Sequence, residues 1–346
     1  MNVFLLILFL VTIYNIKPCL MSGNKDYLSV DDTNAVKGIF IMFVFFRHIT
    51  SYLDEFEDLD RAMLKLDHAL GQLIVVMFLF YSGYGVVYSI LNRENYMEGF
   101  VKKRLGHLVL EFDVIVLIFY VVEMLVGRVL PIKRLALSLV AWDSVGNSNW
   151  YIFAIFFLYL FTFISWKLFK NNNAIYLLMM VILVSGYVLI MMQFKQDCWY
   201  NTVFAYVFGM FWAMYKERID KVLGNNAVYI VLFIAAVAIC FVTRMHLVNV
   251  VIYEVMSLAF AFLVVLFTMK VKVGNSILAY LGENLFPFYI LQRLPMFVLK
   301  AKTDVTHNNT VFLMYSMIGT IVLVWVYRRT KKMIAAGAAS LNKKGS

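Results

Sequence analysis

The sequence has little charge and few residues that interrupt a helix. Of its 346 residues only 15% are charged, four are proline and 17 are glycine, whereas 63% are hydrophobic and the mean hydropathy is +0.80. Soluble domains contain about a quarter charged residues and about half apolar ones. The apolar runs are also too long, and alternate too weakly, for the strands of a membrane barrel, which span about ten residues. These absences predict an all-α integral membrane protein.

Cysteine is equally scarce. Cys19, Cys198 and Cys240 lie far apart in the sequence and show neither metal-site spacing nor the pattern of a disulfide framework. No cluster of histidine, cysteine or methionine has ligand spacing either. We therefore expect no metal site, and we interpret the three cysteines as small packing residues.

Eleven apolar stretches are long enough to be membrane-spanning helices. The first has no basic residue ahead of it and no cleavage pattern after it, so it predicts a retained helix in preference to a cleaved signal peptide. The stretches cover residues 2–16, 37–53, 69–91, 106–127, 150–169, 174–193, 200–215, 227–243, 248–269, 276–298 and 309–327.

The distribution of lysine and arginine predicts the orientation in the membrane. If residues 17–37 are cytoplasmic, the connectors and tail on that side hold twenty of these residues and the opposite connectors hold nine. Cytoplasmic loops carry such an excess. We therefore expect a multi-pass protein with its N-terminus outside and its C-terminus in the cytoplasm. No internal repeat is visible, which disfavours a transporter built from two duplicated halves.

Two ionisable residues share one face of the predicted second helix, NAVKGIFIMFVFFRHITSYL. Lys37 and His48 are eleven positions apart, which is three turns plus about 20° and roughly 16 Å along the axis. A cation near one surface and a deeper imidazole fit an elongated substrate with an anionic end, such as acyl-coenzyme A (acyl-CoA). Two interpretations stay open, because Lys37 extending to the interface and His48 hydrogen-bonded in helix packing explain the same residues. Ionisable groups inside membrane helices are, however, functional candidates by default.

Lys37, ten intervening residues and His48 resemble the basic-x10-His signature of the acyltransferase type 3 family, whose first residue is commonly arginine. The resemblance covers roughly residues 33–300 and implies a core of ten helices, to which the first helix is an addition. Further segments that resemble the family, in its order, are FLFYSGYGVVYSI (78–90), VKKRLGHL (101–108), NWYIFAIFFLYL (149–160), AYVFGMFWA (205–213) and LGENLFPFYIL (281–291).

The resemblance implies a domain organisation and an activity. An extra N-terminal helix and connector would occupy residues 1–32, a membrane acyltransferase domain residues 33–330, and a basic cytoplasmic tail residues 331–346. The implied enzyme of a cell membrane transfers an acetyl or other short acyl group from cytoplasmic acyl-CoA, typically acetyl-CoA, to a hydroxyl of a cell-surface or lipid-linked glycan. Nucleic acid is not an expected partner. Composition and topology alone leave open a transporter or flippase for a lipid-linked sugar.

The resemblance also implies roles for individual residues. His48 is the expected general base, and Lys37 is expected to act with it by facing the phosphates of coenzyme A. The expected remainder of the coenzyme site is the basic element Lys102, Lys103, Arg104 and His107, for which a positive-inside anchor is the alternative.

The expected substrate-binding residues are Arg47, Ser82, Tyr84, Trp150 and Glu283. Helix packing is the alternative for Tyr84, an interfacial position for Trp150, and a charge at a helix N-terminus for Glu283. Two positions depart from the family pattern. His107 replaces the last basic residue of the RRxxR-like element, and Gln292 stands where many members have a histidine.

Overall fold

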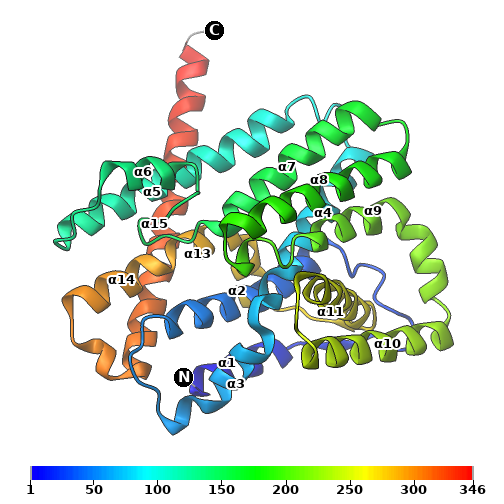
Figure 1. The fold of residues 1–346 in the computed structure, drawn as a ribbon, viewed down its shortest axis with the longest axis horizontal. Helices are drawn as coiled ribbons and strands as arrows, with labels where there is room; N and C mark the ends of the chain where they lie inside the picture. Colours follow the sequence, from blue (N-terminus) through cyan, green and yellow to red (C-terminus); the bar gives the residue numbers. More distant parts are fainter. Residues whose placement is uncertain (1, 345–346) are drawn as a thin grey trace.

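The computed structural model describes residues 2–344, and this part of the chain is almost entirely helical (Figure 1). One short ladder joins β1 (Lys17–Pro18) to β2 (Val271–Lys272) in antiparallel register. The helices in chain order are α1 (Asn2–Ile13), α2 (Val30–Thr50), α3 (Arg61–Leu70), α4 (Val76–Asn92), α5 (His107–Leu125), α6 (Ile132–Leu139), α7 (Trp150–Phe169), α8 (Asn173–Phe194), α9 (Phe204–Leu223), α10 (Asn226–Met245), α11 (Val250–Lys270), α12 (Ser276–Glu283), α13 (Leu285–Leu291), α14 (Arg293–Lys302) and α15 (Asn309–Lys344).

Six helical stretches of the described chain are long and apolar enough to cross a membrane. Helices α2, α5 and α9 have 21, 19 and 20 residues, but each carries three or more charged residues. The all-α membrane fold is therefore supported, whereas the predicted number of eleven spans is not established. The six stretches are Arg61–Asn92, Trp150–Phe169, Asn173–Phe194, Asn226–Met245, Val250–Lys270 and Asn309–Gly337.

The predicted helix over 276–298 is interrupted in the structure. It consists of α12, α13 and α14, with Asn284 and Gln292 at the two junctions. Pro287 and Pro295 lie in the first turns of α13 and α14, where a helix does not need the N–H group that proline lacks. The hydropathy of the segment is continuous across both junctions, so the apolar pattern alone predicted a single helix.

Two helix crossings depend on glycine. A Cβ at Gly38 of α2 would collide with the backbone of Leu278 in α12, and a Cβ at Gly282 would collide with the backbone of Asn34. Gly83 of α4 and Gly209 of α9 permit an equally close approach of those two helices. Small residues allow helix backbones to approach in membranes. These crossings hold α2 and α4, which carry His48 and Ser82, in fixed positions.

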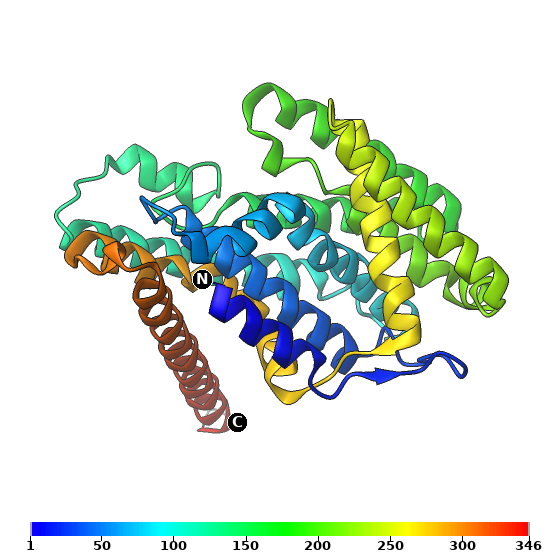
Figure 2. The ribbon, with the colours of Figure 1, turned by 90° about the horizontal axis from the view of Figure 1, so that it is seen from below.

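Ion pairs lie at both ends of the molecule, and each of those described here joins two residues that the sequence predicts to lie on the same side of the membrane. At one end, Lys272 pairs with Asp32 at 3.4 Å, and Lys331 of α15 pairs with Glu111. At the other end, Lys300 pairs with Asp54 at 2.7 Å. Figure 2 shows the C-terminus and β1 toward one edge and the connector containing α6 toward the opposite edge. Helix α15 continues through most of the predicted tail, whose residues 345 and 346 lie outside the described chain.

Candidate active site

His48 occupies the last turn of α2, at the end of the molecule predicted to face outward. Its ring centroid lies 6.2 Å from that of Tyr289 in α13, and Tyr289 lies 5.4 Å from Tyr151 in α7. The Nδ1 atom of His48 is buried and has no hydrogen-bond partner among the described residues. Nδ1 therefore does not form the hydrogen bond expected of a packing histidine. This nitrogen remains able to bind a polar group.

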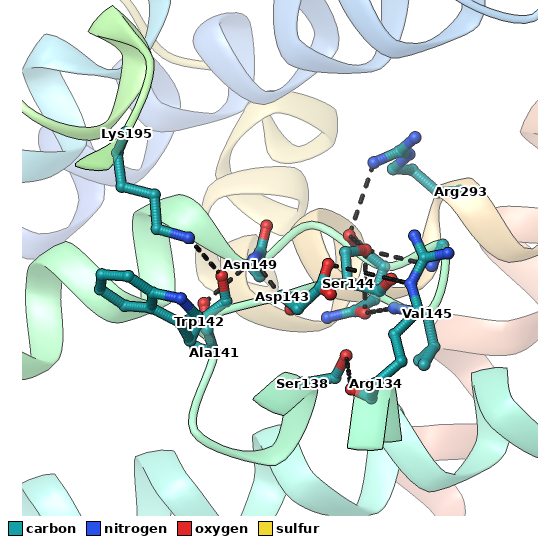
Figure 3. Close-up of polar contacts among 12 residues, drawn as sticks. Arg134, Ser138, Ala141, Trp142, Asp143, Ser144, Val145, Asn149, Lys195 and Arg293 are labelled. Atoms are coloured by element: carbon teal, nitrogen blue, oxygen red, sulfur yellow. Dashed lines mark hydrogen bonds and ion pairs between the residues drawn. The ribbon is translucent and has the colours of Figure 1, made fainter. Parts of the chain in front are cut away.

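Arg293 is one of two arginines, with Arg47, whose charge acts on this imidazole. It is the first residue of α14, and its guanidinium lies close enough to His48 to act on it electrostatically. Its Nε donates to the hydroxyl of Tyr52 at 3.2 Å. Its Nη1 donates at 3.5 Å to the backbone carbonyl of Asn147 in the connector before α7, and Figure 3 shows Arg293 beside this connector. The break before α14 thus places a positive charge beside His48.

The connector between α6 and α7 forms one wall of this region and is held by its own hydrogen bonds. Asn149 donates through Nδ2 to the carbonyls of Ala141 and Asp143, at 3.0 and 2.9 Å. Arg134 donates to the carbonyl of Ser144 at 2.8 Å (Figure 3). These bonds satisfy the backbone of an irregular segment and fix the direction of the side chains that follow it.

Lys195 contacts Trp142 in the connector between α6 and α7. Its Nζ donates to the carbonyl of Trp142 at 2.6 Å and lies 3.8 Å from the centre of the Trp142 ring and 4.3 Å from that of Trp199 (Figure 3). Partial burial lowers the pKa of Lys195, and the nearby charge of Asp143 opposes this shift. The contact joins the connector after α8 to the connector before α7.

Several polar atoms near His48 are buried without a partner. Within the described chain they are Nδ2 of Asn147, Oγ of Ser148 and the hydroxyl of Tyr289, and Ser148 lies near that hydroxyl. A buried donor left unsatisfied costs about 1–3 kcal/mol, so such atoms are rare and need an explanation. They belong to Tyr289, to Ser148 near its hydroxyl and to Asn147, whose carbonyl meets Arg293, and such a group of unsatisfied atoms is typical of a site that receives a polar ligand.

A row of polar side chains leads from the other end of the molecule to His48. Arg104 donates through Nε to the hydroxyl of Tyr96 at 3.1 Å, and Tyr159 lies near both residues. The hydroxyl of Ser82 in α4 lies near both Tyr159 and Tyr151. Tyr151 in turn contacts Tyr289, which adjoins His48. The row connects the two ends through the middle of the helix bundle.

The predicted site residues lie in different parts of the molecule. Three of them, His48, Ser82 and Arg104, lie along this row. Lys37 is partly buried on α2, on the same helix as His48, and forms no ion pair among residues 2–344. Lys102, Lys103 and His107 are exposed next to Arg104, in and just after a π-helical turn over Val101–Gly106.

Three other predicted residues have partners of their own. Arg47 pairs with Asp67 of α3 at 2.7 Å, and its charge, like that of Arg293, acts on His48. Tyr84 stacks on Tyr88 at 5.9 Å. Glu283 is exposed at the end of α12 and lies 3.9 Å from Arg328.

The last two predictions concern Trp150 and Gln292. Trp150 packs edge-on against Tyr151, with 5.9 Å between the ring centroids. It therefore contacts a residue of the row without belonging to the row. Gln292 is buried and donates to the carbonyl of Tyr289 at 3.2 Å. It therefore supports the turn that carries Tyr289, in the place where many relatives are expected to have a histidine.

Sequence reasoning missed the residues that surround the imidazole. Arg293 had a usable signal, because it is a cation within a predicted helix. Tyr289 lies in the segment LGENLFPFYIL, but nothing in the segment distinguishes it from packing residues. Asn147 and Ser148 lie in a connector and carry no signal at all, since only the fold of the connector directs them toward α2.

Comparison with known proteins gives one match. A family model described as an acyltransferase domain, of the acyltransferase type 3 family, matches residues 30–329. No curated protein and no solved structure gives a significant match. The matched range includes His48, the polar row, Arg293 and every predicted site residue.

Proposed function

Because the chain belongs to the acyltransferase type 3 family, we propose that it transfers a short acyl group, such as acetyl, from acyl-CoA to a hydroxyl of a cell-surface or lipid-linked glycan. The observation that carries this proposal is the row of polar side chains between Arg104 and His48, which ends at a buried imidazole nitrogen without a partner. A donor and an acceptor on opposite sides of a membrane require such a connection.

In the proposed reaction coenzyme A binds from the cytoplasmic side. Its phosphates lie near Arg104 and the exposed Lys102 and Lys103, and Lys37 adds a cation farther along the path. The pantetheine arm follows the row formed by Tyr159, Ser82 and Tyr151. Cations and phosphates form strong charge-assisted hydrogen bonds, so the basic end holds the coenzyme while the thioester reaches His48.

His48 acts as general base. One ring nitrogen accepts the proton of the acceptor hydroxyl as the hydroxyl oxygen attacks the thioester carbonyl carbon. The carbon–sulfur bond then breaks, the thiolate of coenzyme A leaves, and the imidazolium returns the proton to it. An ester and free coenzyme A result. A positioned base of this kind contributes about 10²–10⁴ in rate.

The groups around the imidazole stabilise the negative oxygen that forms during the attack. Arg293 supplies a positive charge, and Asn147, Ser148 and Tyr289 supply donors that have no other partner. Donors held in place before the reaction are effective because they need not reorganise. This role explains why the fold retains unsatisfied groups in a buried position.

The test is transfer of labelled acetyl from acetyl-CoA to membrane glycans by the full-length protein in membranes. We expect alkali-labile label in the glycan with the wild-type protein and a loss of about 10²-fold or more with His48→Ala. The matched control is His246→Ala, at an exposed histidine after α10. A His48→Ala protein that is stably made and fully active would refute the mechanism, and sugar movement without acyl transfer would indicate a flippase.

A further inference from the structure

A polar cleft of about 630 Å³ lies beside the end of the molecule that carries His48. It is formed where α3 meets α4, by the connector between α8 and α9, and by the connector between α10 and α11. In contrast, the hollow beside Trp212 and Phe262 is lined almost entirely by apolar side chains. Its polar lining includes Arg47, Gln72, Asp197, Arg244, Asn249 and Tyr253.

Three contacts join the walls of the cleft to α3 and to the segment that follows it. Arg47 pairs with Asp67 at 2.7 Å, and Nη2 of Arg244 donates to the carbonyl of His68. The hydroxyl of Tyr253 accepts the backbone N–H of Gln72 at 3.0 Å. Gly71 makes this last contact possible, because its φ of +51° suits glycine and a Cβ there would lie 3.3 Å from that hydroxyl. The cleft is therefore formed in advance of any ligand.

The cleft offers unused polar groups of several kinds. The Oε1 atom of Gln72 is buried without a hydrogen-bond partner in the described chain. Asn249 uses its side-chain oxygen to cap α11, at 3.0 Å from the N–H of Ile252, which leaves its amide N–H₂ available. Amide donors and acceptors beside tyrosine rings are suited to the hydroxyls and apolar faces of a sugar ring.

Arg244 adds a positive charge to the cleft, and Asp197, which accepts a hydrogen bond from the Tyr200 hydroxyl, is an acidic residue that also lines it. Arg47 is compensated by Asp67, whereas Arg244 forms no ion pair among residues 2–344 and donates only to a carbonyl. A guanidinium binds carboxylate and phosphate groups with good geometry. The ligand expected from this chemistry is a saccharide that carries an acidic group.

The cleft also adjoins the imidazole. Arg47 lines the cleft and is the chain neighbour of His48. Cys198 lies near Arg47 on one side and near Tyr289 on the other. The cleft and His48 therefore lie at the same end of the molecule, on neighbouring parts of the fold.

We propose that this cleft is the acceptor subsite and that it binds an acidic saccharide, with the acidic group on Arg244 and ring hydroxyls on Gln72 and Asn249. The role of the bound saccharide as acyl acceptor rests on the proposed acyltransferase function. The binding itself depends only on the residues of the cleft, so binding and turnover are tested separately.

The binding test is saturation-transfer NMR on the purified full-length protein in detergent, with glucuronate, glucose 6-phosphate and glucose as probes. We expect both acidic sugars to bind more tightly than glucose, and Arg244→Gln to weaken them at least tenfold while leaving glucose unchanged. Preference for glucuronate over glucose 6-phosphate would assign a carboxylate, and the reverse preference a phosphate. Equal binding of all three sugars, or no binding, would overturn the proposal.

Three controls separate a local effect from misfolding. Arg61→Gln removes an exposed arginine of α3 that pairs with Asp58 outside the cleft, and it should change nothing. Arg244→Lys keeps the cation and should retain much of the affinity for the acidic probes. Gln72→Leu should lower the affinity for all three sugars. If Arg244→Gln binds the acidic probes as tightly as the wild type does, the assignment of Arg244 is wrong.

The turnover test distinguishes this proposal from the acyltransferase function. Consumption of acetyl-CoA without added acceptor should be lost in His48→Ala, whereas transfer to glycan by Arg244→Gln should show a raised acceptor KM. Sugar binding that depends on Arg244, in a protein that never consumes acetyl-CoA, would refute the acyltransferase function alone. Acetyl transfer with an unchanged acceptor KM in Arg244→Gln would refute the cleft alone.

Discussion

The ring of Tyr289 lies 6.2 Å from the imidazole of His48, although the first residue belongs to α13 and the second to α2. The contact exists because the segment before α15 is interrupted at Asn284 and again at Gln292. Tyr289 is buried, and its hydroxyl has no partner in the described chain. The fold therefore keeps an unsatisfied group next to its candidate base.

We predict that Tyr289→Phe preserves or raises thermal stability while it lowers acyl transfer about tenfold. Removing a buried hydroxyl without a partner relieves a desolvation cost of about 1–3 kcal/mol. The same hydroxyl is available to the reacting oxygen in the proposed site. Unfolding temperature and transfer rate are measured on the same preparation.

The matched control for Tyr289 is Tyr176→Phe, because the hydroxyl of Tyr176 in α8 is also buried without a partner. It should preserve or raise stability with no change in transfer. If Tyr289→Phe and Tyr176→Phe both transferred acyl groups as fast as the wild type, Tyr289 would not be part of the active site.

Lys37→Ala is expected to raise the KM for acyl-CoA about tenfold, which corresponds to about 1.4 kcal/mol of binding free energy. Lys37 forms no ion pair in residues 2–344, so its charge is available to a phosphate. Lys37→Arg keeps the charge and should retain most of the affinity. Steady-state kinetics check this, with Lys167→Ala as a control at an exposed lysine of α7. An unchanged KM in Lys37→Ala would favour a purely interfacial role.

Arg293→Gln should reduce kcat by about 10²–10³ with little effect on the KM for acyl-CoA. Loss of one group that stabilises a developing oxyanion has an effect of this size. Arg128→Gln is the control, because Arg128 is a largely exposed arginine at the same end of the molecule, stacked 5.0 Å from the centre of the Phe297 ring. If Arg293→Gln raised KM and left kcat unchanged, Arg293 would bind substrate and not the transition state.

Gly83→Ala and Gly85→Ala form a matched pair on α4. A Cβ at Gly83 would collide with the backbone carbonyl of Tyr206, whereas a Cβ at Gly85 meets nothing within 4 Å. We expect Gly83→Ala to destabilise the protein by about 1–3 kcal/mol and Gly85→Ala to stabilise it by up to about 1 kcal/mol. Thermal unfolding in detergent measures both. Similar unfolding temperatures for the two variants would contradict the close approach of α4 and α9.

Part of the candidate site was accessible from local pattern alone. The spacing of Lys37 and His48 places both on one helix, and the segments around Ser82 and Arg104 follow the order of the family. Arg47 and Glu283 are predicted to bind substrate, and this role stays a prediction. The local pattern did not indicate their partners in the fold, since Asp67 lies 2.7 Å from Arg47 and Arg328 lies 3.9 Å from Glu283.

The sequence by itself determined the class of the fold, the approximate positions of its helices and the family, because hydrophobic length and residue spacing are local properties of the chain. Only the tertiary structure decided what faces His48. Tyr289 and Arg293 reach it through breaks in a segment of continuous hydropathy, and an irregular connector held by its own hydrogen bonds places the carbonyl of Asn147 at Arg293 and Ser148 near Tyr289. Contacts between distant segments depend on how helices cross, and at α2 and α4 those crossings are set by the close approach that glycine allows.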